Sequence, residues 1–300
     1  DPYLGSKIAK ARVSGFQGLD LSSPSTIAAC AKHFAAYGFV EAGRDYNTAD
    51  VGAATLNNII LPPFKAAKDA GVKTFMNSFN DLNGIPATGD TYLQRTVLKE
   101  NWNFDGFIVS DWGSISEMVA HGYAKGDNHA AELAINAGSD MDMESHLYVN
   151  ELASLVKEGK VDPALINDAA RRILKVKFEL GLFDDPYKYC DEAREASVIG
   201  SQSNLSEVLD LAKKSIVLLK NENNLLPLAK KGQKIAVIGA LASDKTSPLG
   251  NWRLAADINS AVSLLEGLKA YSGNTITYAK GADLTTGKTE FVSDLTINTT

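Results

Sequence analysis

Apolar runs alternate with helical segments through the first 180 residues, and this alternation constrains the fold more than any other feature. The runs at residues 27–37, 72–79, 107–109 and 140–143 predict strands, and a segment with helical spacing follows each of them. Strands that alternate with helices form a parallel sheet. A closed barrel of eight such units takes about 250 residues. We therefore expect the second half of a barrel, with the first half upstream of residue 1.

Helical spacing covers residues 51–70, 92–101, 149–157 and 163–180, and two short helical runs occupy residues 115–137. Pro62 and Pro63 are expected to break or kink the first of these helices, because proline lacks a backbone donor. Asp162 is expected to cap the last helix, with Pro163 at its first position and Gly181 just past its end.

A second domain is expected after a linker. Residues 183–203 lack periodicity and are rich in Asp, Pro and Ser, which is typical of a linker. Beyond it, helices are predicted near residues 205–214 and 261–271, and strands at 216–219, 234–239 and 275–279. The resulting division is 1–183 for the barrel part, 184–204 for the linker, and 205–300 for the start of a second α/β domain.

Charge and composition exclude several classes of partner. Asp and Glu number 36 against 30 Lys and Arg, and the net charge of −6 disfavours nucleic acid or an anionic membrane and favours a neutral substrate. No apolar run is long enough to cross a bilayer. The two cysteines are far apart and have no metal-ligand spacing, so neither a disulfide framework nor a zinc site is indicated. No residues cluster as metal ligands, and no cofactor is expected. The chain begins with Asp1 and not with Met, so the native N-terminus is expected upstream.

The stretch from Asp105 to Gly113 (DGFIVSDWG) is the best candidate for a site. It places Asp111 just past a short apolar strand, and acids at the carboxyl ends of barrel strands face the open mouth. The alternative is that Asp111 caps the helix that begins near Ile115. Lys32 and His33 lie near the far end of another apolar run, where adjacent polar side chains are costly unless something polar faces them.

Several ordered motifs resemble family 3 glycoside hydrolases, in particular their bacterial β-glucosidase branch. The matching segments span residues 1 to about 285 and are DPYLG (1–5), KHFAAYG (32–38), LPPF (61–64), MNSFNDLNG (76–84), SDWG (110–113), GLF (181–183) and SIVLLKNENNLLPL (215–228). The resemblance implies a (β/α)8 TIM-like barrel followed by an α/β (αβα) sandwich domain, with the active site between them.

The resemblance also implies an activity, a retaining exo-acting β-glucosidase that removes terminal non-reducing β-D-glucosyl residues by double displacement with two carboxylates. Asp111 takes the place of the nucleophile. The residues that align with the sugar-binding positions are Lys32, His33, Met76, Phe79, Trp112 and Trp252. If Lys32 and His33 both reach one sugar, the backbone there must depart from a regular strand, because adjacent side chains of a strand point to opposite faces.

Phe79 stands where many relatives have Tyr, which removes one hydroxyl near the nucleophile. The acid/base of this branch would lie beyond Thr300 and is unknown. Branches that use a second His near the Lys-His motif are disfavoured, because residues 34–38 contain none. His121, His129 and His146 are expected at the surface.

Three other functions stay open. A β-xylosidase or arabinofuranosidase would use the same scaffold, and room for a C6 hydroxymethyl group would distinguish them. A non-catalytic sugar-binding fragment is a second possibility. A nucleotide site after residues 235–239 is a third, disfavoured because no glycine-rich loop follows. The resemblance implies a periplasmic or extracellular protein, and the oligomeric state, homodimer included, is open.

Overall fold

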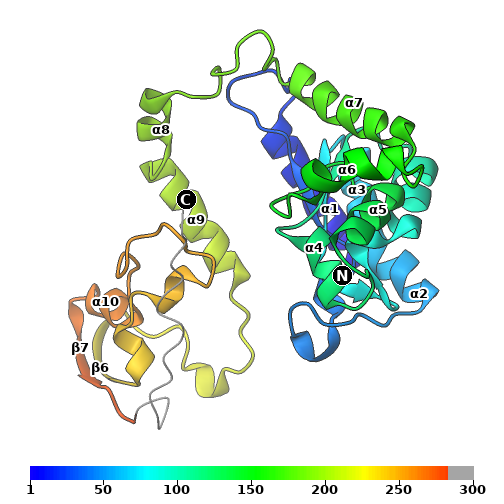
Figure 1. Cartoon of the computed structure of the whole chain (residues 1–300). Coiled ribbons are helices and arrows are strands. Elements are labelled where there is room, and N and C mark those ends of the chain that lie inside the picture. The colour runs from blue at the N-terminus through cyan, green and yellow to red at the C-terminus, as the bar shows by residue number, and fades with distance from the viewer. Residues whose placement is uncertain (283–300) are drawn as a thin grey trace. The chain divides into compact units, whose positions relative to one another are not determined.

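The fold is mixed α/β, and the computed structural model describes residues 1–282 of it (Figure 1). The chain forms two compact units, one comprising Asp1–Ser201 and the other beginning at Gln202. The boundary falls inside the stretch interpreted as a linker, and that stretch also contains the helix α8 (Glu192–Val198).

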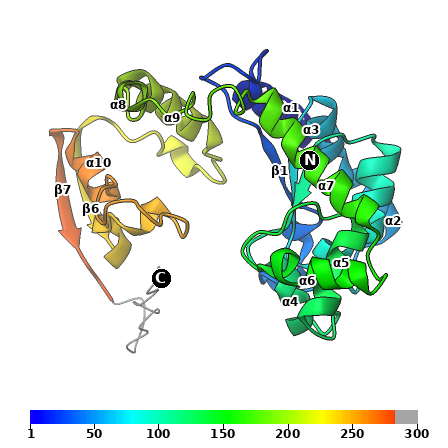
Figure 2. The ribbon, with the colours of Figure 1, turned by 45° about the horizontal axis from the view of Figure 1, so that its top comes forward.

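The first unit is built on a parallel sheet of three strands in the order β1-β2-β5. Figure 2 shows β1 of this sheet beside α1. These strands are β1 (Cys30–Phe34), β2 (Thr74–Asn77) and β5 (Phe107–Val109), and each lies within a predicted run. The fourth predicted strand, 140–143, is reduced to a single bridge between Val109 and Met141. A short antiparallel pair, β3 (Asp81–Leu82) and β4 (Ile85–Pro86), follows β2.

Helices and short helical turns connect the strands of this unit. The α-helices are α1 (Pro2–Gln17), α2 (Ala53–Thr55), α3 (Leu61–Asp69), α4 (Ser114–Ala120), α5 (Asp127–Ala137), α6 (Leu147–Lys157) and α7 (Pro163–Glu179). Two segments are π-helical, η3 (Leu56–Ile60) and η5 (Tyr92–Asn101), and three are 3-10 turns, η1 (Tyr37–Phe39), η2 (Glu41–Gly43) and η4 (Ala87–Gly89).

The helical run continues through Pro62 and Pro63, and it changes from the π-helical η3 to the α-helix α3 directly before them. Asp162 caps α7 as expected, and its carboxylate accepts the N–H of Ala164 at 2.8 Å.

Aromatic side chains fill the core of the first unit. Phe34 and Phe75 are fully buried and pack edge to face with their ring centroids 5.4 Å apart. Phe104, just before β5, packs on Phe75 at 4.9 Å in the same manner. Such contacts add to the stabilisation that comes from burial, and they join β1, β2 and the residue just before β5 in one core.

A glycine lets β5 approach its neighbour closely. A Cβ atom at Gly106 would lie 2.0 Å from the carbonyl oxygen of Lys73 and 2.7 Å from the ring of Phe104. The carbonyls of Phe104 and Gly106 both accept hydrogen bonds from Arg172 Nη1 of α7 at 2.9 Å. The start of β5 therefore has no room for a side chain on this residue.

We expect Gly106→Ala to lower the free energy of unfolding by about 2–3 kcal/mol, because backbone atoms must move to admit the methyl group. Gly15→Ala is the matched control. It lies in α1 with no neighbour within 4 Å of the added Cβ, so it should be neutral or stabilise by up to about 1 kcal/mol. Urea unfolding of the two variants measures the difference, and equal stabilities would contradict the close approach.

A buried ion pair ties β5 to the chain that follows it. The carboxylate of Asp140 accepts hydrogen bonds from Lys99 Nζ at 2.6 Å and from the backbone N–H of Ile108 at 2.8 Å. The Lys99 and Asp140 side chains are only 8% and 3% exposed. Burial lowers the pKa of Lys99, and the negative charge of Asp140 opposes that shift.

The second unit contains two paired parallel strands, β6 (Lys231–Ile238) and β7 (Gly273–Ala279). The helix α10 (Leu264–Lys269) lies in the connection between them. Ser263 and Glu266 form a capping box at the start of α10, as the hydrogen bonds between each side chain and the other's backbone N–H show. Val237, Ala242 and Leu265 form its small core. The helix α9 (Gln202–Ser215) and the turn η6 (Glu222–Asn224) precede β6, and the turns η7 (Ala240–Ser243) and η8 (Ser247–Leu249) lie between β6 and α10.

The predicted strand at residues 216–219 is wrong. These residues form no strand, and their side chains are 60–91% exposed. A strand needs a neighbour to take its backbone hydrogen bonds, and no other strand among residues 1–282 pairs with this run.

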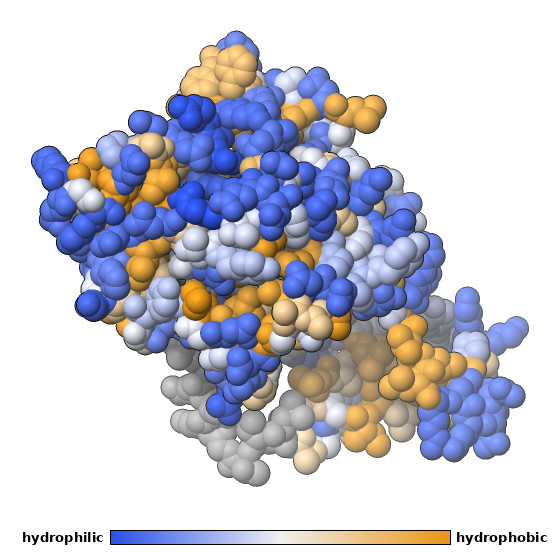
Figure 3. All heavy atoms as spheres, turned by 90° about the vertical axis from the view of Figure 1, so that its right-hand side faces the viewer, coloured by the Kyte–Doolittle hydropathy of each residue, from blue (hydrophilic) through white to orange (hydrophobic). Residues whose placement is uncertain are grey.

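Hydrophobic side chains also reach the surface, where Figure 3 shows them in patches among hydrophilic ones. On α1 the exposed apolar residues are Tyr3, Leu4, Ile8 and Phe16. None of the helices within residues 1–282 has the length and apolar character that a bilayer crossing requires.

Candidate active site

Asp111 lies two residues beyond β5, and the backbone fixes its carboxylate. Oδ1 accepts the N–H of Trp112 at 2.7 Å, and the side chain is buried. The backbone carbonyl of Asp111 accepts the hydroxyl of Ser110 and the N–H of Ser114. The capping alternative is wrong, because Gly113 occupies the N-cap of α4 and no side chain caps that helix.

The second oxygen of this carboxylate has different surroundings. Within the described part of the chain, Asp111 Oδ2 is buried and has no hydrogen-bond partner. Its neighbour is His33, with Nε2 at 3.4 Å. Burial lowers the pKa of His33, more than the charge of Asp111 raises it, so the imidazole is neutral near pH 7.

Lys32 and His33 sit where β1 departs from regular pairing. Ala31 pairs with Phe75 and Phe34 pairs with Asn77, so three steps along β1 match two along β2. The expected irregularity is therefore present, and the peptide bond between Lys32 and His33 is cis. Lys32 Nζ lies 3.9 Å from Met76 Sδ at the end of β2. The structure thus brings Lys32, His33, Met76 and Asp111 together.

The predicted aromatic residues fall into different surroundings. Phe79 packs against the rings of Tyr37 and Tyr46. Trp112 is 61% exposed beside Asp111. Trp252 belongs to the second unit, where it is 85% exposed. The structure therefore presents both indole rings to solvent and places Phe79 in an aromatic group.

Several polar groups near Asp111 were not predicted. Glu117 of α4 has a buried oxygen, Oε2, without a hydrogen-bond partner among residues 1–282, and burial raises the pKa of its carboxyl. The surface prediction is wrong for His121, which is 13% exposed and lies 3.0 Å from Asp81. Tyr37 and Asp45 come from the polar loop after β1. The position of that loop, at the carboxyl end of a strand, is the signal that could have identified them.

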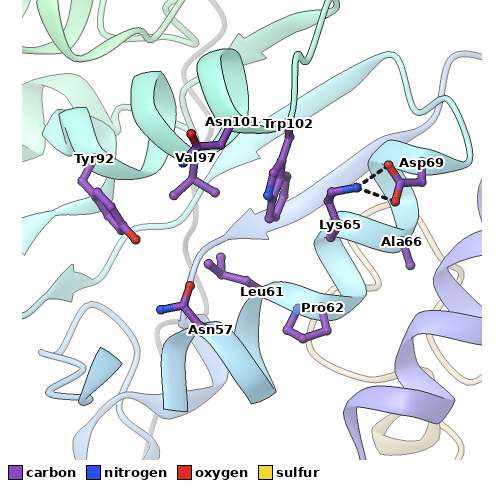
Figure 4. A pocket seen from close by; sticks show the side chains of 10 residues that line it. All are labelled: Asn57, Leu61, Pro62, Lys65, Ala66, Asp69, Tyr92, Val97, Asn101 and Trp102. Atoms are coloured by element: carbon purple, nitrogen blue, oxygen red, sulfur yellow. Dashed lines mark hydrogen bonds and ion pairs between the residues drawn. The ribbon is translucent and has the colours of Figure 1, made fainter. Parts of the chain in front are cut away.

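The residues that the structure describes contain no cluster of His, Cys, Asp and Glu that could hold a metal ion. A groove between α3 and η5 contains none of the predicted site residues (Figure 4). Trp102 and an ion pair between Lys65 and Asp69 contribute to its wall. The predicted residues Lys32, Met76 and Asp111 therefore lie at the ends of β1, β2 and β5 and not in this groove.

Both parts of the chain match models of known protein families. Residues 1–176 match the family model described as the glycosyl hydrolase family 3 N terminal domain, and residues 216–296 match that family's C-terminal domain. The first match covers more than half of the chain.

Known proteins and solved structures are similar to nearly the whole of this chain. A periplasmic β-glucosidase of Salmonella typhimurium is 41% identical over 293 residues, which are 96% of this chain and 38% of that protein. A β-xylosidase of Formosa agariphila is 35% identical, over 95% of this chain and 42% of that protein. The crystal structure of a β-glucosidase from Listeria innocua in complex with gluconolactone aligns with a TM-score of 0.85 and 37% identity, over 95% of this chain and 40% of that one. The chain thus spans about two fifths of the length of these relatives.

Proposed function

This chain belongs to glycosyl hydrolase family 3, and from that premise we propose that it carries the nucleophile of a retaining β-glucosidase. The substrate is a β-glucoside or oligosaccharide with a terminal non-reducing β-D-glucosyl residue. The observation that supports this most strongly is the carboxylate of Asp111. One oxygen is held by a backbone N–H, and the other lies beside His33 without a hydrogen-bond partner among residues 1–282.

In the proposed reaction Asp111 Oδ2 attacks the anomeric carbon, and the bond from that carbon to the departing oxygen breaks. A carboxylic acid protonates the departing oxygen, and the proposal assigns this acid/base to a residue outside residues 1–300. Water then releases glucose from Asp111. Lys32 and neutral His33 donate hydrogen bonds to sugar hydroxyls, and Met76 and Phe79 line the sugar pocket.

Trp112 is proposed to contact a second sugar, since flat aromatic faces cover the C–H face of a pyranose. Trp252 of the second unit is proposed as a sugar-binding residue by the same chemistry. The architecture proposed is a (β/α)8 barrel that includes residues 1–183, a linker at 184–204, and an αβα sandwich from 205. Support comes from the parallel order of β1, β2 and β5, and from a β1 edge that has no strand partner within residues 1–282. A periplasmic or extracellular location is proposed from the name of the Salmonella relative.

A β-xylosidase is the second candidate, because the Formosa relative carries that name. Xylose differs from glucose by lacking the C6 hydroxymethyl group. The preference between the two sugars therefore distinguishes the candidates.

The experiment uses the full-length protein, meaning these residues with whatever chain accompanies them in the native molecule. It is incubated with 2-deoxy-2-fluoro-β-glucosyl fluoride, whose fluoride leaves without an acid, and separately with the xylosyl reagent. We expect rapid labelling by the glucosyl reagent, found on Asp111 by peptide mapping. Faster labelling by the xylosyl reagent would favour the second candidate. A label on another carboxyl, or none, would refute the assignment.

A further inference from the structure

A row of aromatic rings leads away from the carboxylate of Asp111. His33, which lies beside Asp111, packs on the ring of Tyr37 with centroids 4.7 Å apart. Tyr37 lies 6.3 Å from Phe79, and Phe79 lies 4.5 Å from the ring of Tyr46. The row connects the end of β1 with the segment after β2. Tyr46 thus belongs to the same group of side chains as the proposed sugar-binding residues.

The loop that carries Tyr46 is held in shape by its own hydrogen bonds. The N–H of Tyr46 donates to the carboxylate of Asp45 at 2.9 Å, and the N–H of Glu41 donates to the carbonyl of Thr48 at 2.9 Å. The N–H of Ala49 donates to the carbonyl of Asp81 at 2.8 Å and so fastens the loop to β3. Tyr46 is therefore presented by a closed loop that needs little ordering before it meets a ligand.

The ring and the hydroxyl of Tyr46 both remain available. The residue is 44% exposed although Phe79 backs one side of its ring. Its hydroxyl has no hydrogen-bond partner within the described part of the chain. Burial raises its pKa, and the carboxylates of Glu117, Asp45 and Asp111 raise it further. The phenol therefore keeps its proton and is a donor close to the nucleophile.

A sugar fits this surface better than an apolar or charged group does. The face of a phenol ring covers the C–H face of a pyranose, and a phenol hydroxyl pairs with a sugar hydroxyl. An anion would be repelled by Asp45, Asp111 and Glu117. An apolar group would leave the hydroxyl of Tyr46 and Glu117 Oε2 without partners.

We propose that Tyr46 is a substrate-contacting residue that helps determine sugar specificity, with its ring against the pyranose and its hydroxyl bonded to one hydroxyl of the sugar. This inference rests on the proposed glycosidase function. It adds a loop residue that the sequence motifs do not identify.

The test measures kcat/KM of the full-length protein on an aryl β-glucoside and on its 2-, 3-, 4- and 6-deoxy analogues. The variants are Tyr46→Phe, which removes only the hydroxyl, and Tyr46→Ala. Tyr92→Phe is the matched control, because Tyr92 is 48% exposed and lies in the groove of Figure 4.

We expect Tyr46→Phe to lower kcat/KM on the parent glucoside about five- to tenfold, as the loss of one hydrogen bond does, and Tyr46→Ala to lower it more. On one deoxy analogue, wild type and Tyr46→Phe should react alike, because the sugar hydroxyl that Tyr46 contacts is already absent. Tyr92→Phe should stay within about twofold of wild type.

An equal loss for Tyr46→Phe on the parent and on every deoxy analogue would overturn the inference, because the hydroxyl would then act on the protein and not on the sugar. No loss at all would overturn it too. In both cases the wild type would still hydrolyse the glucoside, so the proposed function would stand. A wild type without glycosidase activity would remove both proposals.

Discussion

Asp111→Asn is expected to lower kcat/KM for an aryl β-glucoside by at least about a thousandfold in the full-length protein. The amide keeps the size of the side chain and can still accept the N–H of Trp112, so the turn before α4 should hold its shape. An amide oxygen is a far weaker nucleophile than a carboxylate, and the glycosyl-enzyme cannot form. The measurement is steady-state kinetics together with mass-spectrometric labelling.

The matched control for this variant is Asp142→Asn. Asp142 follows Met141, which bridges to Val109, and its carboxylate accepts the N–H groups of Ser145 and Tyr148 at 3.2 Å. The two N–H groups bond to different carboxylate oxygens, so the amide oxygen of Asn can keep one of these bonds. Asp142 is not a proposed nucleophile, so activity should change only a few-fold. A strong loss in Asp142→Asn with a mild one in Asp111→Asn would place the nucleophile elsewhere.

Lys99→Met is expected to lower the free energy of unfolding by about 3–5 kcal/mol, because it leaves the carboxylate of Asp140 buried without its cation. The remaining donor to that carboxylate is the N–H of Ile108. We expect this N–H to exchange with solvent faster, since β5 loses its anchor. Urea unfolding and hydrogen exchange of the peptide that contains β5 measure the two effects.

Lys65→Met is the control, because it breaks an ion pair with the same distance between nitrogen and oxygen. Lys65 Nζ lies 2.6 Å from Asp69, as Lys99 does from Asp140, but the two side chains are 40% and 52% exposed. An exposed pair contributes about 1 kcal/mol or less. If both lysine variants lost the same stability, burial would not be the source of the effect. Adding Asp140→Leu to Lys99→Met should recover part of the loss, because the buried charge is then gone.

Apolar periodicity was sufficient to predict the strands at the centre of the first unit. β1, β2 and β5 each lie within predicted runs, because strands covered by helices must be apolar in sequence. The runs at 140–143 and 216–219 show the limit of this reasoning. The first forms one bridge and the second lies exposed, since side-chain pattern does not specify which neighbour takes the backbone hydrogen bonds.

Some residues of the candidate site could be predicted from the sequence, and others could not. The motifs identified Lys32, His33 and Met76, and the structure brings them to Asp111, although their roles stay predictions. Tyr46 could not be found by pattern. Its position depends on left-handed backbone conformations at Ala36, Ala42 and Tyr46 itself, which no glycine in the sequence marks.

The hydrogen bond that orients Asp111 comes from the backbone of Trp112 and not from its side chain. Every residue except proline has that donor. In the proposed site, the side chain at position 112 could therefore be exchanged, and the second sugar with it, without changing the direction of the Asp111 carboxylate. If the proposed roles hold, substrate preference and reactive geometry depend on different atoms of the same residue, so they can vary independently.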